Sequence, residues 1–519
     1  MSLRAASSAC LAVIVAVAGA AMGFADDAGR AALVRQERQP GADLGNGYYR
    51  NPILAGDYGD PSVVRVGGDF YMMQSGGGGG LPNLLIWHSR DLVNWRPIGK
   101  ALNQPLGSPW APDLIFHKGK FHIYVTLVDQ ARGEGRQFMN VVLTATNAAG
   151  PWSEPVDLKL YGHIDPGHVV DAEGNRWLFV EKGNVIRLAP DGLSTVGELK
   201  QVYGGWPIPP DWVVECFCLE SPKLLWRGGW LYLVSAQGGT AGPSTSHMIV
   251  VARAKSPLGP WENAPRNPLL RTVSREQRWW SQGHGTIVDD MAGNWWVVFH
   301  AYENGYRALG RQTLLRPVKW NADGWPEIPG EGDSSGVFTK PAGDDLGHGL
   351  PVSNDFASTQ LGLQWYRREA AKPDSFEVGG GVLKLRGHGT KIADAANLCC
   401  KPLNHAYEAQ VQVMSSGSDS AGLLLQAGDN SYGLLIREGK VQVQWRGRAY
   451  PLAEVPEGKA WLKVRNVNHD TSAFYSLDGK VWTKCDRSAE LSSARVRIAL
   501  VALGEGEASF RDFHYTGLE

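Results

Sequence analysis

Short apolar runs recur in pairs along the first two thirds of the chain, and each pair is separated by a glycine-containing turn. In the stretch 219–240, the apolar run 223–226 is followed by Gly228-Gly229 and by a second run at 230–234. Glycine adopts positive φ without steric cost, so this pattern predicts a β-hairpin. The same pattern predicts four more hairpins, at 63–73, 114–125, 169–180 and 287–299.

The predicted hairpins return at nearly constant intervals. An aromatic residue opens each second strand, and successive ones lie 51, 56, 53 and 65 positions apart: Phe70, Phe121, Trp177, Trp230 and Trp295. Phrases that close on a tryptophan, at Trp95, Trp152 and Trp261, keep a similar period. Five hairpins at a period near fifty are typical of a five-bladed β-propeller. The alternative, unrelated hairpins in one large β-sandwich, is disfavoured because two separate marks share the period.

One ionisable side chain stands at the entrance to each hairpin. In chain order these residues are Asp60, Asp113, Asp165, Glu220 and His284. If the repeats superpose, all five lie at the start of the innermost strands, so residues more than 200 positions apart meet in one pocket. Carboxylates held close together raise each other's pKa. A chain that tolerates this cost is predicted to use the ring of acids.

The pattern of apolar and polar residues changes after the repeats. Residues 330–353 are rich in Gly, Asp, Ser and Pro without apolar periodicity, which indicates a linker. From residue 354 short alternating segments follow with no hairpin–Trp period, and they predict a β-sandwich. We therefore predict an all-β protein with a propeller at 47–329 and a β-sandwich at 354–519. The sandwich could bind sugar or support the propeller, and the sequence favours support.

The first residues have the pattern of a secretory signal. Arg4 supplies a positive charge, 10–21 are apolar, and Gly23-Phe24-Ala25 forms a small-x-small cleavage site. The apolar run is too short to span a bilayer. We expect a signal peptide at 1–25, a flexible lead at 26–46, no membrane partner, and a secreted or periplasmic location.

Composition narrows the function. The formal net charge of −1 gives no basic excess for a nucleic acid partner. Twenty tryptophans suit a protein that stacks indoles on sugars, although most of them are expected to pack between blades. Five cysteines follow the signal, so one thiol is left over in any intramolecular pairing. Cys216 and Cys218 would share one strand face, so we expect packed thiols rather than a bridge.

The repeats resemble glycoside hydrolase family 43 almost from end to end. The segments that carry the resemblance occur in order: Asp60-Pro61-Ser62, Trp110-Ala111-Pro112-Asp113, Asp165-Pro166, Glu220-Ser221-Pro222, Gly238-Gly239-Thr240, Gly283-His284-Gly285 and Gly310-Arg311-Gln312-Thr313. The phrase at 88–95, which ends in Asn94-Trp95, is similar too. The tail is similar to the concanavalin-like domain that follows the propeller in the family's β-xylosidases.

The resemblance implies an inverting glycosidase that acts on plant pentosan, as a β-xylosidase or an α-L-arabinofuranosidase. It implies Asp60 as the general base, Glu220 as the general acid, and Asp165 as the group that orients the acid and raises its pKa. It also implies a substrate site with Trp110, His284 and Arg311, while Asp113 has no catalytic role. No cofactor is required, but Ca²⁺ near His284 is possible because parts of the family bind it there.

Two alternatives stay open at this point. One is a non-catalytic carbohydrate-binding propeller, which the presence of all three carboxyl groups disfavours. The other is the same machinery with galactan-type specificity. Five glycines at 76–80 stand where the family's β-xylosidases carry bulky aromatic residues. They supply no wall for the sugar, so the substrate is the least determined part of the prediction.

Overall fold

The structure is a computed structural model. It describes residues 39–76, 84–102, 106–129, 132–133, 137–330, 332–367, 376–416, 419–428, 430–492 and 495–518. The predicted signal peptide and most of the glycine run at 76–80 lie outside these residues. The described part of the chain contains no helix with the length and apolar character needed to cross a membrane.

Five antiparallel sheets follow one another in the described residues between 62 and 327. The first holds β2 (Ser62–Val66), β3 (Asp69–Met73), β4 (Leu85–Ser89) and β5 (Arg96–Lys100). The second holds β6 (Ser108–His117), β7 (Lys120–Val128), β8 (Phe138–Ala145) and β9 (Val156–Tyr161). The third holds β10 (Gly167–Val170), β11 (Arg176–Val180), β12 (Asn184–Leu188) and β13 (Thr195–Gln201).

The last two sheets complete the set. The fourth holds β14 (Glu220–Arg227), β15 (Trp230–Gln237), β16 (Met248–Ala254) and β17 (Glu262–Asn263), and β18 (Leu270–Arg271) also pairs with β16. The fifth holds β19 (Trp279–Asp289), β20 (Trp295–Glu303), β21 (Arg311–Trp320) and β22 (Pro326–Glu327). All five predicted hairpins are confirmed: they are the first two strands of each sheet.

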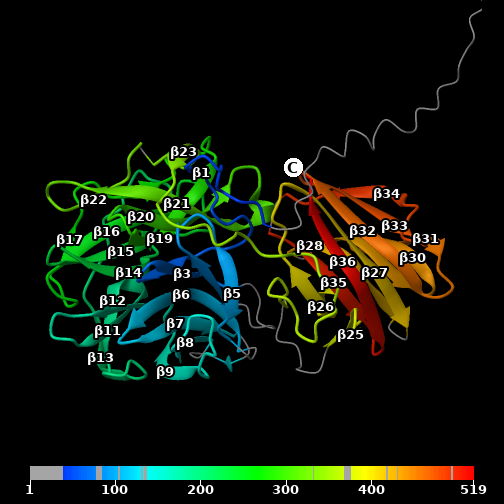
Figure 1. The fold of residues 1–519 in the computed structure, drawn as a ribbon, viewed down its shortest axis with the longest axis horizontal. Coiled ribbons are helices and arrows are strands. Elements are labelled where there is room, and N and C mark those ends of the chain that lie inside the picture. The colour runs from blue at the N-terminus through cyan, green and yellow to red at the C-terminus, as the bar shows by residue number, and fades with distance from the viewer. Residues whose placement is uncertain are drawn as a thin grey trace, which may run out of the picture.

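The first strands of the five sheets are neighbours in space. β2 contacts β6 and β19, β10 contacts β6 and β14, and β14 contacts β19. These contacts close the sheets into a ring, the left-hand body of Figure 1, which we call the sheet ring. The first strands of the five sheets therefore surround a common centre.

Aromatic side chains fill the space between the sheets. Trp87 and Trp95 are fully buried, and the Trp95 indole donates to the Leu92 carbonyl at 2.8 Å. Trp152 is buried too and donates to the Ala148 carbonyl at 3.1 Å. An indole buries a large apolar area and needs one partner for its N–H. These tryptophans thus serve packing.

Two further sheets form the second body of Figure 1. In the described residues, one sheet has the order β24 (Phe376–Gly379), β25 (Val382–Arg386), β36 (Glu507–Gly517), β27 (Ala406–Ser416), β32 (Lys459–Val467), β33 (Asp470–Ser476) and β34 (Thr483–Glu490). The other has the order β26 (Ala396–Cys400), β35 (Val496–Leu503), β28 (Ser420–Ala427), β29 (Asn430–Arg437), β30 (Lys440–Trp445) and β31 (Arg448–Glu454). The predicted β-sandwich is confirmed.

The segments before and after the sheet ring are packed onto it. β1 (Tyr48–Arg50) pairs with β23 (Val337–Thr339), which belongs to the predicted linker. The Lys340 ammonium contacts the carboxylates of Asp43 and Asp91, the latter at 2.8 Å. Both the described end of the predicted lead and the linker are therefore anchored. Short 3₁₀ turns complete the described structure: η2 (Glu181–Gly183), η3 (Arg307–Leu309) and η4 (Ile392–Asp394).

The prediction for Cys216 and Cys218 is wrong, because the two residues form a disulfide. They do not lie on a strand. The segment is irregular, Cys218 has φ 38°, and the Cα atoms come to 5.2 Å. On an extended strand their side chains would point the same way, farther apart. Cys399, Cys400 and Cys485 are buried, as expected for packed thiols.

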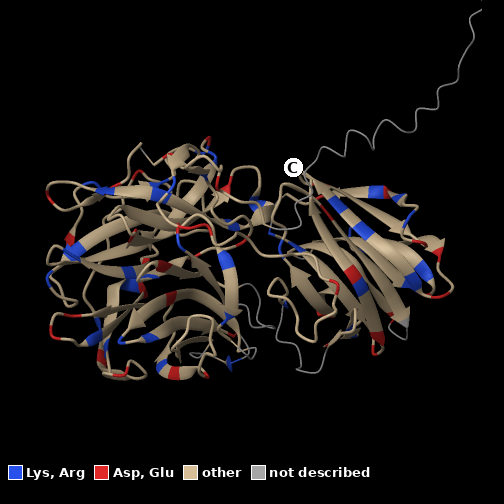
Figure 2. Ribbon diagram, viewed as in Figure 1, with Lys and Arg blue, Asp and Glu red and all other residues tan. Residues whose placement is uncertain are grey.

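Charged side chains of both signs are interspersed over both bodies (Figure 2). This agrees with the formal net charge of −1. A nucleic-acid-binding face would need a concentration of Lys and Arg. In the view of Figure 2, Lys and Arg are mixed with Asp and Glu and are not gathered into one such patch.

Candidate active site

A left-handed backbone residue occurs at the same place in every sheet. Asp60, Ala111, Asp165 and Ser221 each precede a proline and have φ of 60°, 36°, 58° and 57°, and His284 has φ 54° in the fifth sheet. Positive φ is uncommon for residues other than glycine and clusters at functional sites. This places Asp60, Asp165 and His284 in equivalent positions. The expected equivalence of Asp113 and Glu220 is wrong: Glu220 lies one residue earlier and Asp113 two residues later.

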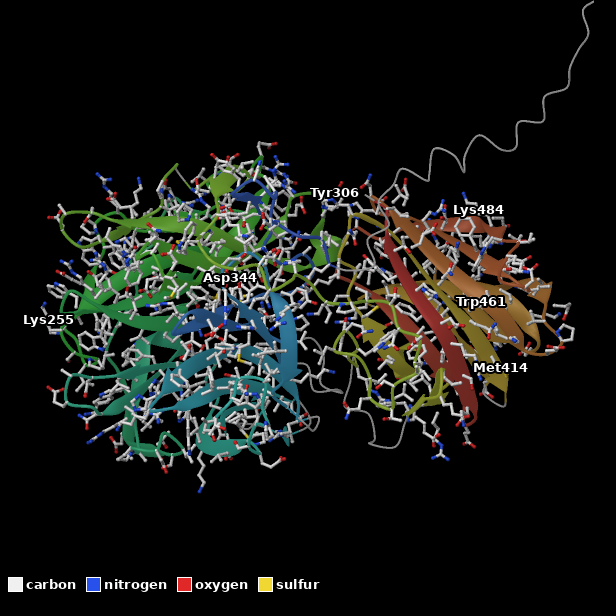
Figure 3. The ribbon with its side chains drawn as sticks, viewed as in Figure 1. Lys255, Tyr306, Asp344, Met414, Trp461 and Lys484 are labelled. Atoms are coloured by element: carbon white, nitrogen blue, oxygen red, sulfur yellow. A yellow bond between two sulfur atoms is a disulfide. The ribbon has the colours of Figure 1, made fainter. Side chains whose placement is uncertain are left out.

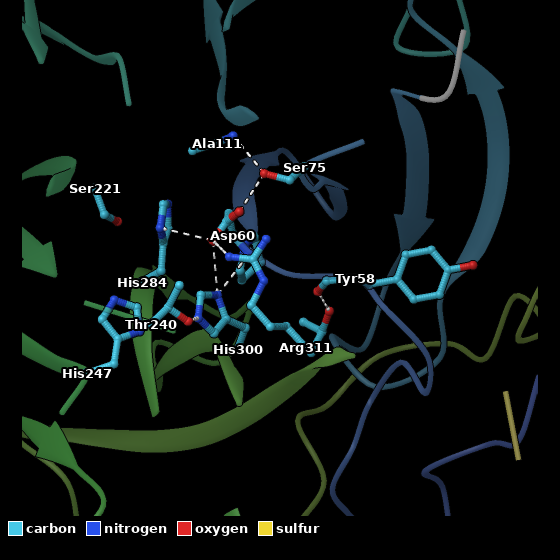
Figure 4. Close-up of polar contacts among 12 residues, drawn as sticks. Tyr58, Asp60, Ser75, Ala111, Ser221, Thr240, His247, His284, His300 and Arg311 are labelled. Atoms are coloured by element: carbon cyan, nitrogen blue, oxygen red, sulfur yellow. Dashed lines mark hydrogen bonds and ion pairs between the residues drawn. The ribbon is translucent and has the colours of Figure 1, made fainter. Parts of the chain in front are cut away.

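Asp60 is the centre of a polar cluster (Figure 4). One carboxylate oxygen lies 2.6 Å from Arg311 Nη1, 3.2 Å from His284 Nδ1 and 3.1 Å from His300 Nδ1. The other accepts a hydrogen bond from the Ser75 hydroxyl at 2.5 Å. The backbone N–H of Asp60 donates to His300 Nδ1 at 3.0 Å. Three strands of the fifth sheet and the segment after β3 thus fix this carboxylate from several sides.

These neighbours decide the charge on Asp60. Burial by itself would raise the pKa of the carboxyl, but the charge of Arg311 holds the pKa well below its usual 3.8. Burial lowers the pKa of His300 to about 4 and holds the pKa of His284 well below 6.5. The imidazoles are therefore neutral near pH 7, and Asp60 is a carboxylate paired with one guanidinium.

Asp165 has the opposite electrostatic environment. Its Oδ2 accepts a hydrogen bond from the backbone N–H of Ser221 at 3.1 Å and lies 4.0 Å from His284 Nδ1. Burial, the charge of Glu220 and then that of Asp60 raise the pKa of Asp165 well above 3.8. Two Asp-Pro pairs that look alike in sequence thus have opposite preferences for a proton.

Glu220 opens β14 beside this cluster. Its Oε1 lies 3.6 Å from His247 Nε2, and the His247 ring stacks on His300 with centroids 5.1 Å apart. The Glu220 side chain is 19% exposed, against 8% for Asp60 and 7% for Asp165. Of the three carboxyl groups, Glu220 is the most accessible to a molecule entering from solvent.

Asp113 lies next to this cluster, but its carboxylate joins neighbouring sheets. Its carboxylate accepts hydrogen bonds from Lys223 Nζ at 3.0 Å, the His168 backbone N–H at 2.8 Å and the Ser62 hydroxyl at 3.2 Å. These partners come from three other sheets of the ring. The carboxylate is fully used in joining them, which agrees with the structural role expected for it.

Trp110 is an exposed aromatic residue close in the chain to this cluster. Its side chain is 41% exposed and meets Phe138 edge-on at 5.8 Å between centroids. The next residue, Ala111, donates its N–H to the Ser75 hydroxyl that in turn bonds to Asp60. The backbone next to Trp110 is therefore linked to the Asp60 carboxylate through the Ser75 hydroxyl. The backbone N–H of Gly76 donates to the Pro109 carbonyl at 2.9 Å, which ties the described end of the glycine run to β6.

The sequence prediction missed Ser75, His247 and His300. His300 is a polar residue inside the otherwise apolar run 295–302 of β20, and His247 directly precedes β16; both are fully buried. A polar residue inside an apolar strand was an available signal, since buried polar groups need partners. Pairing these residues with Asp60 and Glu220 required the tertiary structure.

Asp60, His284 and His300 bring one carboxylate and two imidazoles within 4.8 Å of one another, as metal ligands do. Ca²⁺, however, prefers about six to eight oxygen ligands. Arg311 also contacts the Asp60 oxygen that an ion would use. The donor set does not fit calcium, and we assign no catalytic step to a metal.

Comparison with known proteins identifies the family. The model of glycosyl hydrolases family 43 matches residues 49–326. The chain belongs to this family. Residues 353–515 of this family 43 protein match the β-xylosidase C-terminal concanavalin A-like domain. Membership makes the protein a glycosidase, as the resemblance implied.

Three relatives illustrate the similarity. The chain is 32% identical over 420 residues to a non-reducing end α-L-arabinofuranosidase of Bacteroides ovatus, with 75% of this chain and 76% of the relative covered. It is 32% identical over 318 residues to a xylan 1,3-β-xylosidase of a Vibrio species, with 54% and 57% covered. A family 43 protein from Bacillus licheniformis has a similar crystal structure, with TM-score 0.78, 27% identity, and 91% and 100% covered.

Proposed function

We propose that this family 43 glycosidase removes single β-xylosyl or α-L-arabinofuranosyl residues from plant pentosan with inversion at the anomeric carbon. The five sheets would be the blades of a five-bladed β-propeller with the active site at its axis. Relatives named as arabinofuranosidase and xylosidase support a pentoside substrate. Residues 1–25 would export the enzyme to the periplasm or the medium.

The observation that carries this proposal is that one buried cluster holds an ionised carboxylate and a second, more accessible carboxyl group. Inversion needs one carboxylate that takes a proton from water and one carboxylic acid that gives a proton to the leaving oxygen. Asp60, held ionised by Arg311, suits the first role. Glu220 is more exposed and lies beside His247, which stacks on His300; it suits the role of the acid.

The proposed reaction is a single displacement. A water oxygen bonds to the anomeric carbon as the glycosidic C–O bond breaks; Asp60 takes the water proton, and Glu220 protonates the departing oxygen. The two carboxyl groups must stand roughly 6.5–9.5 Å apart for the water to fit. Asp165, whose Oδ2 accepts a hydrogen bond from the backbone N–H of Ser221 next to the acid, would orient Glu220. Trp110, His284 and Arg311 would line the sugar site.

Substitution of the two carboxyl groups tests the proposal. We expect Asp60→Asn and Glu220→Gln to lower kcat on xylobiose or arabinoxylo-oligosaccharides by about 10²- to 10⁴-fold, because each removes one proton transfer. Glu220→Gln should lose much less on an aryl pentoside, whose leaving group needs no acid. Proton NMR of the first product should show the inverted anomer.

The matched control is Glu215→Gln. The Glu215 carboxylate accepts the Ala241 N–H at 2.7 Å, and the new amide oxygen keeps that bond. We expect near wild-type rates from this variant. Unchanged turnover in Asp60→Asn, or a retained anomer, would disprove the assignment.

A further inference from the structure

Asp57 lies three residues before Asp60 and contacts both domains. One carboxylate oxygen accepts the backbone N–H of Arg311 at 3.1 Å. The other oxygen accepts a hydrogen bond from Arg495 Nη1 at 3.1 Å, and the Asp57 carbonyl accepts one from the Lys401 ammonium. Arg495 directly precedes β35 and Lys401 directly follows β26, so both cations belong to the β-sandwich. A single acidic residue thus joins that domain to the arginine that pairs with Asp60.

The backbone around Arg311 is bound to the same loop. The Tyr58 N–H donates to the Arg311 carbonyl at 2.7 Å. The backbone N–H and C=O of Arg311 are therefore both bonded to the segment 57–58. A Cβ atom at Gly59 would lie 2.5 Å from Arg311 Nε, which shows how closely the guanidinium packs on this loop. A shift of Asp57 would therefore be passed to Arg311.

Lys401 makes a second contact with this loop. Its ammonium lies 4.3 Å from the centroid of the Tyr58 ring, a cation–π arrangement. Tyr58, Ser75 and Tyr366 line one small cavity between the domains with Lys401. Because Ser75 donates to Asp60, this cavity brings the β-sandwich next to one of the groups that hold the carboxylate.

The charge balance gives these contacts a catalytic consequence. The Asp57 side chain is only 20% exposed. Burial would raise its pKa, but Arg495, Lys401 and Arg311 lower it to about 2, so Asp57 is ionised at neutral pH. If the sandwich withdrew its cations, this carboxylate would be left with Arg311 as its nearest positive charge. The guanidinium would then be shared between Asp57 and Asp60.

We propose that Arg495 and Lys401 of the β-sandwich are positioning residues: by pairing with Asp57 they leave the Arg311 guanidinium to Asp60. The inference rests on the proposed function, in which Asp60 is the general base. It assigns the C-terminal domain a specific part in turnover, beyond general support of the ring.

Arg495→Gln and Lys401→Met in the full-length chain test the proposal. We expect kcat to fall between about ten- and a hundred-fold, because a small displacement of a catalytic group has effects of this size. KM should change less than three-fold. The acidic limb of the pH profile of kcat/KM should move to higher pH, since Asp60 shares its guanidinium. Arg495→Lys keeps the positive charge and should restore most of the turnover.

The matched control is Tyr306→Phe. Tyr306 lies at the junction of the two bodies (Figure 3), and its hydroxyl contacts Asn468 of the β-sandwich at 3.2 Å, a bond that does not involve Asp57, Arg495 or Lys401. This variant loses one interdomain hydrogen bond and should keep wild-type kcat and pH profile.

Each outcome separates the two proposals. An active wild type whose Arg495→Gln variant keeps its kcat and acidic limb would overturn the positioning role alone. Equal losses in Arg495→Gln, Arg495→Lys and Tyr306→Phe, with a lower melting temperature and an unmoved limb, would overturn it in favour of general support. A wild type that hydrolyses no pentoside would instead refute the proposed function, and the positioning role with it.

Discussion

At the scale of single residues, neighbours rather than sequence context decide the chemistry. Asp60 and Asp165 are each followed by proline and share a left-handed backbone. Asp60 lies against Arg311, and its pKa falls, whereas Asp165 lies against Glu220 and Asp60, and its pKa rises. The difference comes from side chains that are between 55 and 251 positions away in the chain.

Removing the Arg311 guanidinium should reverse the bias of Asp60. In the wild type the carboxyl is ionised down to below pH 3.8, so the acidic limb of kcat/KM that it causes should lie below that value. In Arg311→Met burial remains while the positive charge is lost, so the pKa of Asp60 rises and the base is protonated at higher pH. We expect the limb to move upward, measured from pH 3 to 8, with circular dichroism to verify folding.

Arg266→Met is the matched control for this substitution. The Arg266 side chain is 84% exposed and pairs only loosely, at 3.4 Å, with Glu327. The acidic limb of the kcat/KM profile of this variant should coincide with that of the wild type. An unmoved limb in Arg311→Met would contradict the pairing of Arg311 with Asp60.

At the scale of elements, irregularities in or just before the first strand of each sheet direct the side chains of the site. Bulges interrupt the pairing of β6, β14 and β19 with their second strands just where Ala111, Ser221 and His284 lie. A bulge bends a strand and redirects a side chain, and it is frequent next to active sites. The same local device, repeated in the ring, supplies several groups to one centre.

The loop that enters β2 offers a steric test of this arrangement. Gly59→Ala would place a methyl group 2.5 Å from Arg311 Nε. The flexible guanidinium can yield, so we expect little loss of stability but a fall in kcat of about ten-fold or more as Arg311 leaves Asp60. Kinetics and thermal melting of the variant separate the two effects.

Gly68→Ala serves as the comparison in the same hairpin, because a Cβ atom at Gly68 would meet nothing within 4 Å. This substitution should leave kcat unchanged. Equal rates in the two variants would show that the Gly59 contact does not matter for turnover.

At the scale of the whole molecule, one hydrophobic core runs through both bodies. A single cluster of buried side chains includes Tyr58 and Leu92 of the sheet ring, Leu350 of the linker and Trp365 and Leu403 of the β-sandwich side. Domains joined by a small, polar interface can move and unfold separately, whereas a shared apolar core couples them. The linker is part of this core.

We therefore expect the two domains to unfold together. Differential scanning calorimetry of the full chain near pH 7 should show one endothermic transition rather than two. Two well-resolved transitions would contradict a shared core.

The repeat pattern alone was sufficient for much of the architecture. Alternation of apolar residues and glycine turns are local properties, so the five hairpins and the β-sandwich could be predicted from neighbouring positions. Asp60, Asp165, Glu220 and His284 could be picked out as well, because each precedes a predicted hairpin, and Arg311 was implied by the resemblance of its short motif to the family. These predictions needed no knowledge of which sheets meet.

Other features depended on contacts that no local pattern encodes. Electrostatic interaction and close packing depend on distance in space, and the chain brings Arg495 to Asp57 across 438 positions and Arg311 to Asp60 across 251. The histidine stack, the Cys216–Cys218 bridge and the different register of Glu220 arise in the same way, from irregular backbone and from neighbouring sheets. The sequence by itself determined which elements form and which groups they carry; only the tertiary structure decided which of those groups share a proton, a charge or a core.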